Sequence, residues 1–216
     1  ESFYKGKPLG SFGHFAAFSF HETKNISCGE GGLLVINDEK YIPRAEIVWE
    51  KGTNRSAFSR GEVAKYEWVD VGASFVPSEI IAAVLYAQLN HIDDIQQKRI
   101  ALWNRYLKNL TPLAQKGFIS LDNLPEYASN NGHLFYFLVD NQQLRNRLLE
   151  YLNHRFVHAV FHYLPLHKSP FYANRHDGRE LPHTQKYTDQ LIRLPLFYEL
   201  TLEAVDYICN KVFGFF

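Results

Sequence analysis

A chain of 216 residues is long enough to form one or two domains, and 46% hydrophobic with 21% charged residues is typical of a soluble globular protein. Basic and acidic residues number 23 each, so charge gives no reason to expect a nucleic acid or an anionic membrane as a partner. No apolar run approaches the about 18 residues of a spanning helix. Cys28 and Cys209 are too few and too scattered for a disulfide framework or a zinc site, so we expect a reducing cytoplasm.

Two short apolar runs near the start of the chain predict a pair of strands. Residues 15–20 are apolar and aromatic, which favours a buried strand, and residues 33–36 follow a glycine-rich turn. We therefore expect a strand–loop–strand unit with Lys24 in the connection. Residues 37–51 predict a helix, because a polar Asn-Asp cap precedes apolar side chains at approximate helical spacing.

The remainder of the chain predicts helices and a small mixed layer. Residues 52–75 lack clean periodicity and predict a long loop, which in a compact domain is usually functional or disordered. Two strands that alternate with helices favour a small α+β layer near the C-terminus. The predicted helices are 77–89, 92–114, 142–155 and 200–212, and the predicted strands are 134–139 and 159–161.

Lys24 is the first candidate for chemistry. Ser19 precedes it by five residues, and a glycine-rich turn, Gly29-Glu30-Gly31-Gly32, starts five residues after it. A partly desolvated lysine can lose its proton and become a nucleophilic amine that reacts with a carbonyl cofactor. Each part of the pattern is weak alone, because a single lysine is usually a solvated charge and Gly-x-Gly-Gly is usually a tight turn.

The whole string is more specific than its parts. Ser-Phe-His-x-x-Lys-Asn-x-x-x-Gly-Glu-Gly-Gly, residues 19–32, resembles the cofactor-lysine segment of the DegT group of sugar-nucleotide aminotransferases. These are fold-type I enzymes that use pyridoxal 5'-phosphate (PLP). The resemblance implies an α/β fold, a covalent bond from Lys24 to PLP, and a contact between Ser19 and the cofactor phosphate. His21 and Asn25 flank the lysine; either they contact the cofactor, the role expected of Asn25, or they shape the loop through local hydrogen bonds.

Further segments resemble one subgroup of these enzymes, which acts on dTDP-4-keto-6-deoxyglucose. The resemblance implies that glutamate donates the amino group and that the product, dTDP-4-amino-4,6-dideoxygalactose, is a precursor of a surface-polysaccharide sugar. It also implies a cytoplasmic homodimer with shared active sites. The segments are Glu50-Lys51-Gly52-Thr53-Asn54-Arg55, Tyr66-x-Trp68-x-Asp70-x-Gly72, residues 161–167 and residues 194–198.

Four residues are candidates for substrate binding. Arg55 suits the diphosphate, because a guanidinium pairs well with phosphate, although most arginines are surface charges. By the resemblance, His162, Tyr163 and His167 line the sugar pocket, and the alternative is that they are hydrogen-bonded loop residues. We expect no metal there, because no nearby carboxylate or cysteine completes a ligand set.

One segment departs from the family pattern. Many members carry Gly-x-Asn-x-Arg-x-Ser-Glu, whose Asn reaches the cofactor phosphate of the neighbouring subunit, whereas this chain has Ser74 at the Asn position and Val76 at the Arg position. Ser74 can still donate one hydrogen bond to a phosphate. Alternatively Ser74 caps a helix, although Ser78 suits the helix start as well.

The resemblance also implies a domain organisation. Residues 1–90 correspond to the C-terminal part of the PLP-binding large domain, with its N-terminal part absent, and residues 91–216 to a long linking helix and a small C-terminal domain. The absent part would supply the aspartate that keeps the pyridine nitrogen protonated, so we expect the 216-residue chain alone not to transaminate. The alternative is a non-catalytic relative that binds a nucleotide sugar or regulates a partner. Lys24 argues against that alternative, and against family dehydratases, in which histidine replaces this lysine.

Overall fold

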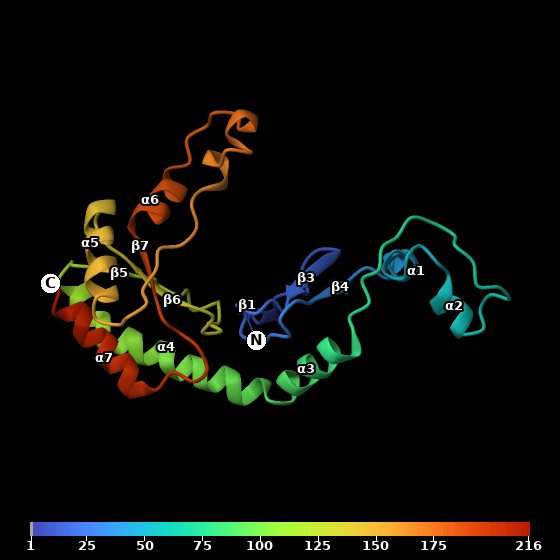
Figure 1. Cartoon of the computed structure of the whole chain (residues 1–216), viewed down its shortest axis with the longest axis horizontal. Helices are drawn as coiled ribbons and strands as arrows, with labels where there is room; N and C mark the ends of the chain where they lie inside the picture. Colours follow the sequence, from blue (N-terminus) through green and yellow to red (C-terminus); the bar gives the residue numbers. More distant parts are fainter. Residues whose placement is uncertain (1) are drawn as a thin grey trace. The chain divides into compact units, whose positions relative to one another are not determined.

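The computed structural model describes residues 2–216, and the chain divides into two compact units. Unit 1 ends at Asp93 and unit 2 begins at Asp94, inside a long helix, α4 (Ile92–Gln115). The chain contains both helices and strands (Figure 1), as expected for the α/β class. Over the described residues, no helix is both long enough and apolar enough to cross a membrane.

Unit 1 contains two antiparallel hairpins and three short helices. The larger hairpin pairs β3 (Phe15–Ser19) with β4 (Gly32–Ile36), in a register that runs from Phe15↔Ile36 to Ser19↔Gly32. This hairpin confirms the predicted strand–loop–strand unit. The other elements are β1 (Phe3–Tyr4), β2 (Lys7–Pro8), the 3-10 turn η1 (Glu39–Tyr41), α1 (Ile42–Trp49), α2 (Arg55–Ser59) and α3 (Glu79–Asn90).

Helix starts in unit 1 follow the predicted capping chemistry. The Ser78 hydroxyl accepts a hydrogen bond from the Ile81 backbone N–H at 3.3 Å, which satisfies one free donor of the first turn of α3. Asp38 accepts from the Lys40 N–H at the start of η1. The prediction of a continuous loop over 52–75 is wrong in part, because residues 55–59 form α2. Five residues of a helix are too few for an apolar period to show in the sequence.

The prediction that β3 is buried is wrong for unit 1 as the structure describes it. Phe15, Phe18, Leu33 and Leu34 are each 41% to 55% exposed. The sheet that carries them has two strands, and their side chains border a broad apolar depression of about 930 Å3, lined also by Trp49 of α1. Apolar residue type therefore identified the strand correctly, but the neighbours needed to bury it do not come from unit 1.

Unit 2 packs helices against a three-stranded antiparallel sheet. The strand order is β5 (Ser120–Leu121), β6 (Phe135–Leu138), β7 (Leu191–Leu194), and the helices besides α4 are α5 (Gln142–Asn153), α6 (Pro182–Gln190) and α7 (Leu202–Phe213). Two 3-10 turns, η2 (Leu166–Lys168) and η3 (Ala173–Arg175), interrupt the segment before α6. Side chains that are at most 1% exposed form the core: Leu102, Tyr106, Leu110, Phe135, Phe137, Leu148, Leu152, Ile192, Val205 and Val212.

One sequence prediction for unit 2 is wrong, and three elements were not predicted. The strand expected at 159–161 is a single bridge, Val160↔Arg193, and the strands β5 and β7 were not predicted. β7 is only four residues long and nearly fully buried, so it shows no alternation of apolar and polar residues. Helix α6 was also missed, because its sequence is polar throughout and has no apolar stripe.

A polar cluster joins α4 to α7. Arg105 donates two hydrogen bonds to the Asp206 carboxylate, at 2.7 and 2.6 Å, and Asn109 donates a third at 2.7 Å. These donors favour the ionised carboxylate and lower the pKa of Asp206 to about 2. Nearby, the buried Tyr106 ring stacks on Phe135 with centroids 4.9 Å apart, and its hydroxyl donates to the Pro195 carbonyl at 2.8 Å.

Acid should weaken unit 2 through Asp206. A carboxylate with a lowered folded-state pKa stabilises the fold above its unfolded pKa, and that stabilisation is lost as pH falls through the folded pKa. We expect the urea midpoint to fall between pH about 4 and about 2, and Asp206→Asn to reduce this dependence. Glu126→Gln, at an exposed position, is the control. Identical pH dependence in Asp206→Asn and the parent chain would contradict the assignment.

Candidate active site

The loop between β3 and β4 is closed by backbone hydrogen bonds. The Phe20 N–H donates to the Gly31 carbonyl at 2.8 Å, and the Phe20 carbonyl accepts from the Cys28 N–H at 3.0 Å. Farther along, the Glu22 N–H donates to the Gly29 carbonyl at 2.9 Å. The ladder of the hairpin thus continues past the strand ends, and residues 23–28 form a compact tip.

Glycine is required in this loop for steric reasons. A Cβ at Gly31 would lie 2.5 Å from the Cys28 sulfur, and Gly29 has φ of +84°, a region that other residues adopt only with strain. The Cys28 side chain is buried at this close approach, and its sulfur lies 3.6 Å from the Glu30 carbonyl oxygen. The Gly-x-Gly-Gly sequence therefore allows the second arm of the loop to pack against the first.

Lys24 lies at the tip of this loop. Its backbone N–H donates to the His21 carbonyl at 2.9 Å, which forms a tight turn, and its side chain is exposed. Asn25 beside it is half-buried. The partly desolvated surroundings expected of the lysine are therefore not supplied by unit 1 itself, but the amine is presented on an ordered turn.

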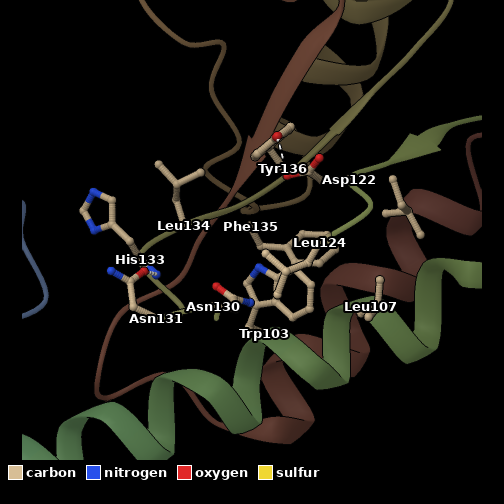
Figure 2. A pocket seen from close by; sticks show the side chains of 11 residues that line it. Trp103, Leu107, Asp122, Leu124, Asn130, Asn131, His133, Leu134, Phe135 and Tyr136 are labelled. Carbon is tan, nitrogen blue, oxygen red and sulfur yellow. Dashed lines mark hydrogen bonds between the residues drawn. The ribbon is translucent and has the colours of Figure 1, made fainter. Parts of the chain in front are cut away.

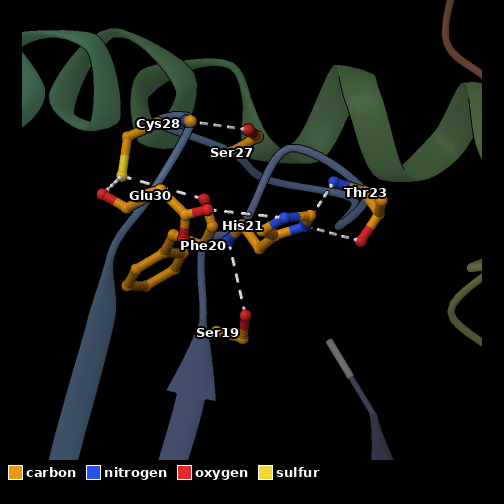
Figure 3. Close-up of polar contacts among 8 residues, drawn as sticks. Ser19, Phe20, His21, Thr23, Ser27, Cys28 and Glu30 are labelled. Atoms are coloured by element: carbon orange, nitrogen blue, oxygen red, sulfur yellow. Dashed lines mark hydrogen bonds and ion pairs between the residues drawn. The ribbon is translucent and has the colours of Figure 1, made fainter.

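Ser19 and His21 are joined to the same turn (Figure 3). The His21 N–H donates to the Ser19 hydroxyl oxygen at 3.3 Å. The imidazole Nδ1 accepts from the Thr23 N–H at 3.2 Å and lies 3.0 Å from the Thr23 hydroxyl, while Nε2 lies 3.6 Å from a carboxylate oxygen of Glu30. His21 therefore forms the local hydrogen bonds that were one of the two roles expected for it. The contacts of Thr23 and Glu30 were not expected from the sequence.

Arg55 and Ser74 belong to a second ordered segment of unit 1. Arg55 is the first residue of α2 and is exposed, and its side chain has no hydrogen bond or ion pair with other residues between 2 and 216. Ser74 is exposed and its backbone bridges to Glu50. The alternative role of Ser74 as a helix cap is wrong, because Ser78 caps α3.

Two glycines let this segment fold back on itself. Gly52 has φ of +79°, and a Cβ there would lie 1.8 Å from the Asp70 carbonyl oxygen. A Cβ at Gly72 would lie 2.1 Å from the Gly52 nitrogen. Asn54 adds side-chain bonds to the backbone on the far arm, at Lys65 and Glu67. Both glycines lie in segments that resemble the aminotransferase subgroup, but the sequence did not indicate that they mark a close approach of two backbones.

The sugar-pocket candidates lie in unit 2, on the segment after α5. Arg193 donates to His162 Nδ1 at 3.3 Å, and burial together with that cation lowers the pKa of His162. The exposed Tyr163 ring lies 4.8 Å from the His162 ring. His167 instead lies 4.9 Å from the ring of His176, and burial, His176 and Lys168 lower the pKa of His167. His162 and Tyr163 are thus together, and His167 has a different partner.

Unit 2 also has a separate cavity of about 180 Å3 (Figure 2), lined by α4 and residues 121–136. Asn130 Nδ2 is buried there and has no hydrogen-bond partner among the described residues, while its oxygen accepts from the Gly132 N–H at 2.9 Å. None of the residues predicted to bind cofactor or substrate lines this cavity. Within residues 2–216, no three His, Cys, Asp or Glu side chains are grouped as metal ligands would be.

The predicted residues therefore form three local groups. Ser19, Lys24 and Asn25 share the β3–β4 loop, Arg55 and Ser74 share the folded-back segment of unit 1, and His162, Tyr163 and His167 share one stretch of unit 2. A nucleophilic amine and a hydroxyl donor on one glycine-supported loop are a suitable combination for holding a phosphorylated carbonyl compound.

Comparison with known proteins identifies the class of protein. Residues 1–213 match the DegT/DnrJ/EryC1/StrS aminotransferase family, and the chain belongs to this family. Because the match covers nearly the whole chain, the family resemblance read from the sequence motifs is confirmed at this level.

Solved structures agree with the family. Helicobacter pylori PseC, an aminotransferase involved in the biosynthesis of pseudoaminic acid, is 25% identical with a TM-score of 0.86, over 99% of this chain and 56% of PseC. DesV of S. venezuelae is 28% identical with a TM-score of 0.84, over 99% of this chain and 54% of DesV. Spr1654 of Streptococcus pneumoniae is described as a sugar aminotransferase and has been solved in its pyridoxamine phosphate (PMP) form. It is 26% identical with a TM-score of 0.84, over 97% of this chain and 55% of Spr1654.

These comparisons confirm the α/β fold of PLP-dependent aminotransferases, of which the chain covers a fragment. The chain spans 54% to 56% of the length of the three structures. Spr1654 has also been solved in a PLP form, with a TM-score of 0.82 to this chain.

The Gly52–Asp70 approach gives a direct test of the folded-back segment. Gly52→Ala adds a clash to an already unfavourable backbone conformation, so we expect proteolysis within residues 53–71 to accelerate by about tenfold or more. Gly61→Ala is the matched control, because Gly61 has φ of +75° with open space around its Cβ position. Equal acceleration in the two variants would show that backbone strain, and not the close approach, matters.

Proposed function

We propose that this chain is part of a PLP-dependent aminotransferase that transfers an amino group from glutamate to a 4-keto-6-deoxy sugar nucleotide. The observation that carries the proposal is the ordered loop that presents Lys24 and Ser19 together, in a chain that belongs to an aminotransferase family. A related protein solved in both PLP and PMP forms supports PLP as the cofactor.

The loop residues fit this cofactor. Ser19 Oγ accepts the His21 N–H, so its own O–H proton is left to donate to a phosphate oxygen. Lys24 carries an accessible amine that can form a covalent bond to an aldehyde. Asn25, half-buried beside Lys24, would add a further polar contact. The glycines at 29 and 31 keep the second arm of the loop free of side chains that would crowd the turn.

Lys24 would have two tasks in the reaction. Its amine would hold the cofactor, and after the incoming substrate amine displaces it, the freed amine would take up and return the proton at the substrate carbon. PLP, when bound, supplies the electron sink that makes loss of this proton possible. Both tasks need the unprotonated amine, and exclusion of water around Lys24 would favour that form.

The substrate proposal is dTDP-4-keto-6-deoxyglucose, which would be converted to dTDP-4-amino-4,6-dideoxygalactose for a surface polysaccharide. It rests on the subgroup motifs, together with the availability of Arg55 for the diphosphate. His162, Tyr163 and His167 are proposed to contact the sugar. Two of them stay uncharged near neutral pH through their lowered pKa, and neutral imidazoles suit hydroxyl groups better than phosphates.

The assembly proposal is a cytoplasmic homodimer with shared active sites. Ser74 would reach the cofactor phosphate of the neighbouring subunit as a single hydroxyl donor, because Val76 removes the cation that many relatives have nearby. We also retain residues 1–90 as part of a PLP-binding large domain. The apolar depression bordered by Phe15, Phe18, Leu33 and Leu34 supports this assignment, since a sheet with such side chains is stable when further layers cover it.

The main test is chemical labelling of Lys24. When the natural full-length protein is incubated with PLP and reduced with borohydride, we expect peptide mapping to place the label on Lys24. Lys24→Ala should reduce transamination to background, because the variant loses both the covalent attachment and the proton carrier.

The matched control is Lys40→Ala, since Lys40 is an exposed lysine paired with Asp38 at 2.8 Å and lies outside the loop. It should retain both label and activity. A label on another side chain, or near-parental turnover of Lys24→Ala, would refute the assignment.

A second test concerns the chain by itself. We expect the 216-residue chain to show no turnover with PLP, glutamate and the keto sugar nucleotide, because the carboxylate that protonates the pyridine nitrogen is expected from residues outside it. Amino-sugar formation measured by chromatography is the readout. Clear turnover would overturn the domain proposal and leave the assignment of Lys24 intact.

A further inference from the structure

His21 connects the two residues proposed to hold the cofactor. Its backbone N–H donates to the Ser19 hydroxyl at 3.3 Å, and its backbone carbonyl accepts from the Lys24 N–H at 2.9 Å. Any change in the backbone at His21 would therefore move both groups. The side chain of His21 folds back over the turn (Figure 3) and adds its own contacts to the backbone hydrogen bonds that close the loop.

The contacts of the imidazole determine which nitrogen carries the proton. The Thr23 backbone N–H can only donate, so Nδ1, at 3.2 Å, must offer its lone pair. The neutral ring then carries its proton on Nε2, which faces the Glu30 carboxylate at 3.6 Å. The side chain thus links the Lys24 turn, on one arm of the loop, to the glycine-rich turn on the other.

We propose that His21 is a positioning residue, which orients Lys24 and Ser19 through the lone pair of its Nδ1. The catalytic importance of Lys24 and Ser19 rests on the proposed function. The effect of His21 on the structure of the loop is independent of that function, because it follows from contacts within residues 19–30.

Two substitutions separate the two ring nitrogens. In His21→Asn the side-chain oxygen can occupy the position of Nδ1 and accept the Thr23 N–H. In His21→Gln the amide reaches toward the position of Nε2 and the acceptor near Thr23 is lost. His14→Asn is the matched control, because His14 is another exposed histidine of unit 1 whose Nε2 faces a carboxylate, Asp38, at 4.0 Å.

The first readout is hydrogen exchange of the natural full-length protein without cofactor, followed by mass spectrometry of peptides from residues 20–31. At pH about 7, after correction for intrinsic exchange, we expect similar protection in the parent protein, His14→Asn and His21→Asn, and about fivefold lower protection in His21→Gln. Equal protection in His21→Asn and His21→Gln would overturn the proposal.

The second readout is borohydride labelling with PLP at pH about 8. We expect His21→Gln to lower labelling at Lys24 several-fold and His21→Asn to retain it. Failure to label Lys24 in the parent protein would refute the proposed function, while the exchange result would still decide the role of His21. Labelling of Lys24 that is equal in all variants would overturn the positioning role.

Discussion

The register of the β3–β4 hairpin is the constraint on which the candidate site depends. Ser19↔Gly32 is the last strand pair, and the next bond, from the Phe20 N–H to the Gly31 carbonyl at 2.8 Å, continues the ladder into the loop. A slip of one residue would turn every side chain of β3 to the other face of the sheet. It would also separate Lys24 from the turn that presents it. Backbone pairing, supported by glycines that permit close approach, therefore sets the position of the reactive amine.

The two units differ in what stabilises them. Unit 2 has a core of fully buried side chains, and burial of each large apolar side chain contributes about 1.5–3 kcal/mol. In unit 1 the described elements are joined mainly by backbone hydrogen bonds and by exposed ion pairs such as Arg60–Glu46, which are individually weak. The candidate lysine thus lies in the unit with less core, where local bonds such as those of His21 have a larger share in fixing the geometry. The small core of unit 1 also explains why the sequence predicted the position of β3 correctly but predicted wrongly that β3 is buried.

Local signals predicted much of the fold. The capping serine of α3, the long periodic helix α4 and the hairpin around Lys24 each depend on neighbours within a few residues, so their sequences contain the necessary information. β7 and α6 depend on tertiary packing, and neither has a periodic pattern of its own. The residues of the candidate site also divide into local and non-local features. The local motif identified Lys24 and Ser19. The pairing of His21 with Glu30 and the approach of Gly52 to Asp70 could not be predicted, because these residues come close only when the loops fold.

Electrostatics distinguishes the cations of unit 1. Its arginines are Arg44, Arg55 and Arg60. Arg44 pairs with Asp70, and Arg60 pairs with both Glu46 and Glu62, whose carboxylates favour its charged form and raise its pKa. A guanidinium already held by two carboxylates would have to give up those bonds to bind a phosphate, whereas Arg55 has no such bonds to lose within the described chain. Of the three arginines of unit 1, Arg44 and Arg60 are therefore held in structural ion pairs, and Arg55 is left to bind an anion. The proposed role of Arg55 in phosphate binding therefore has a physical argument in addition to the motif resemblance.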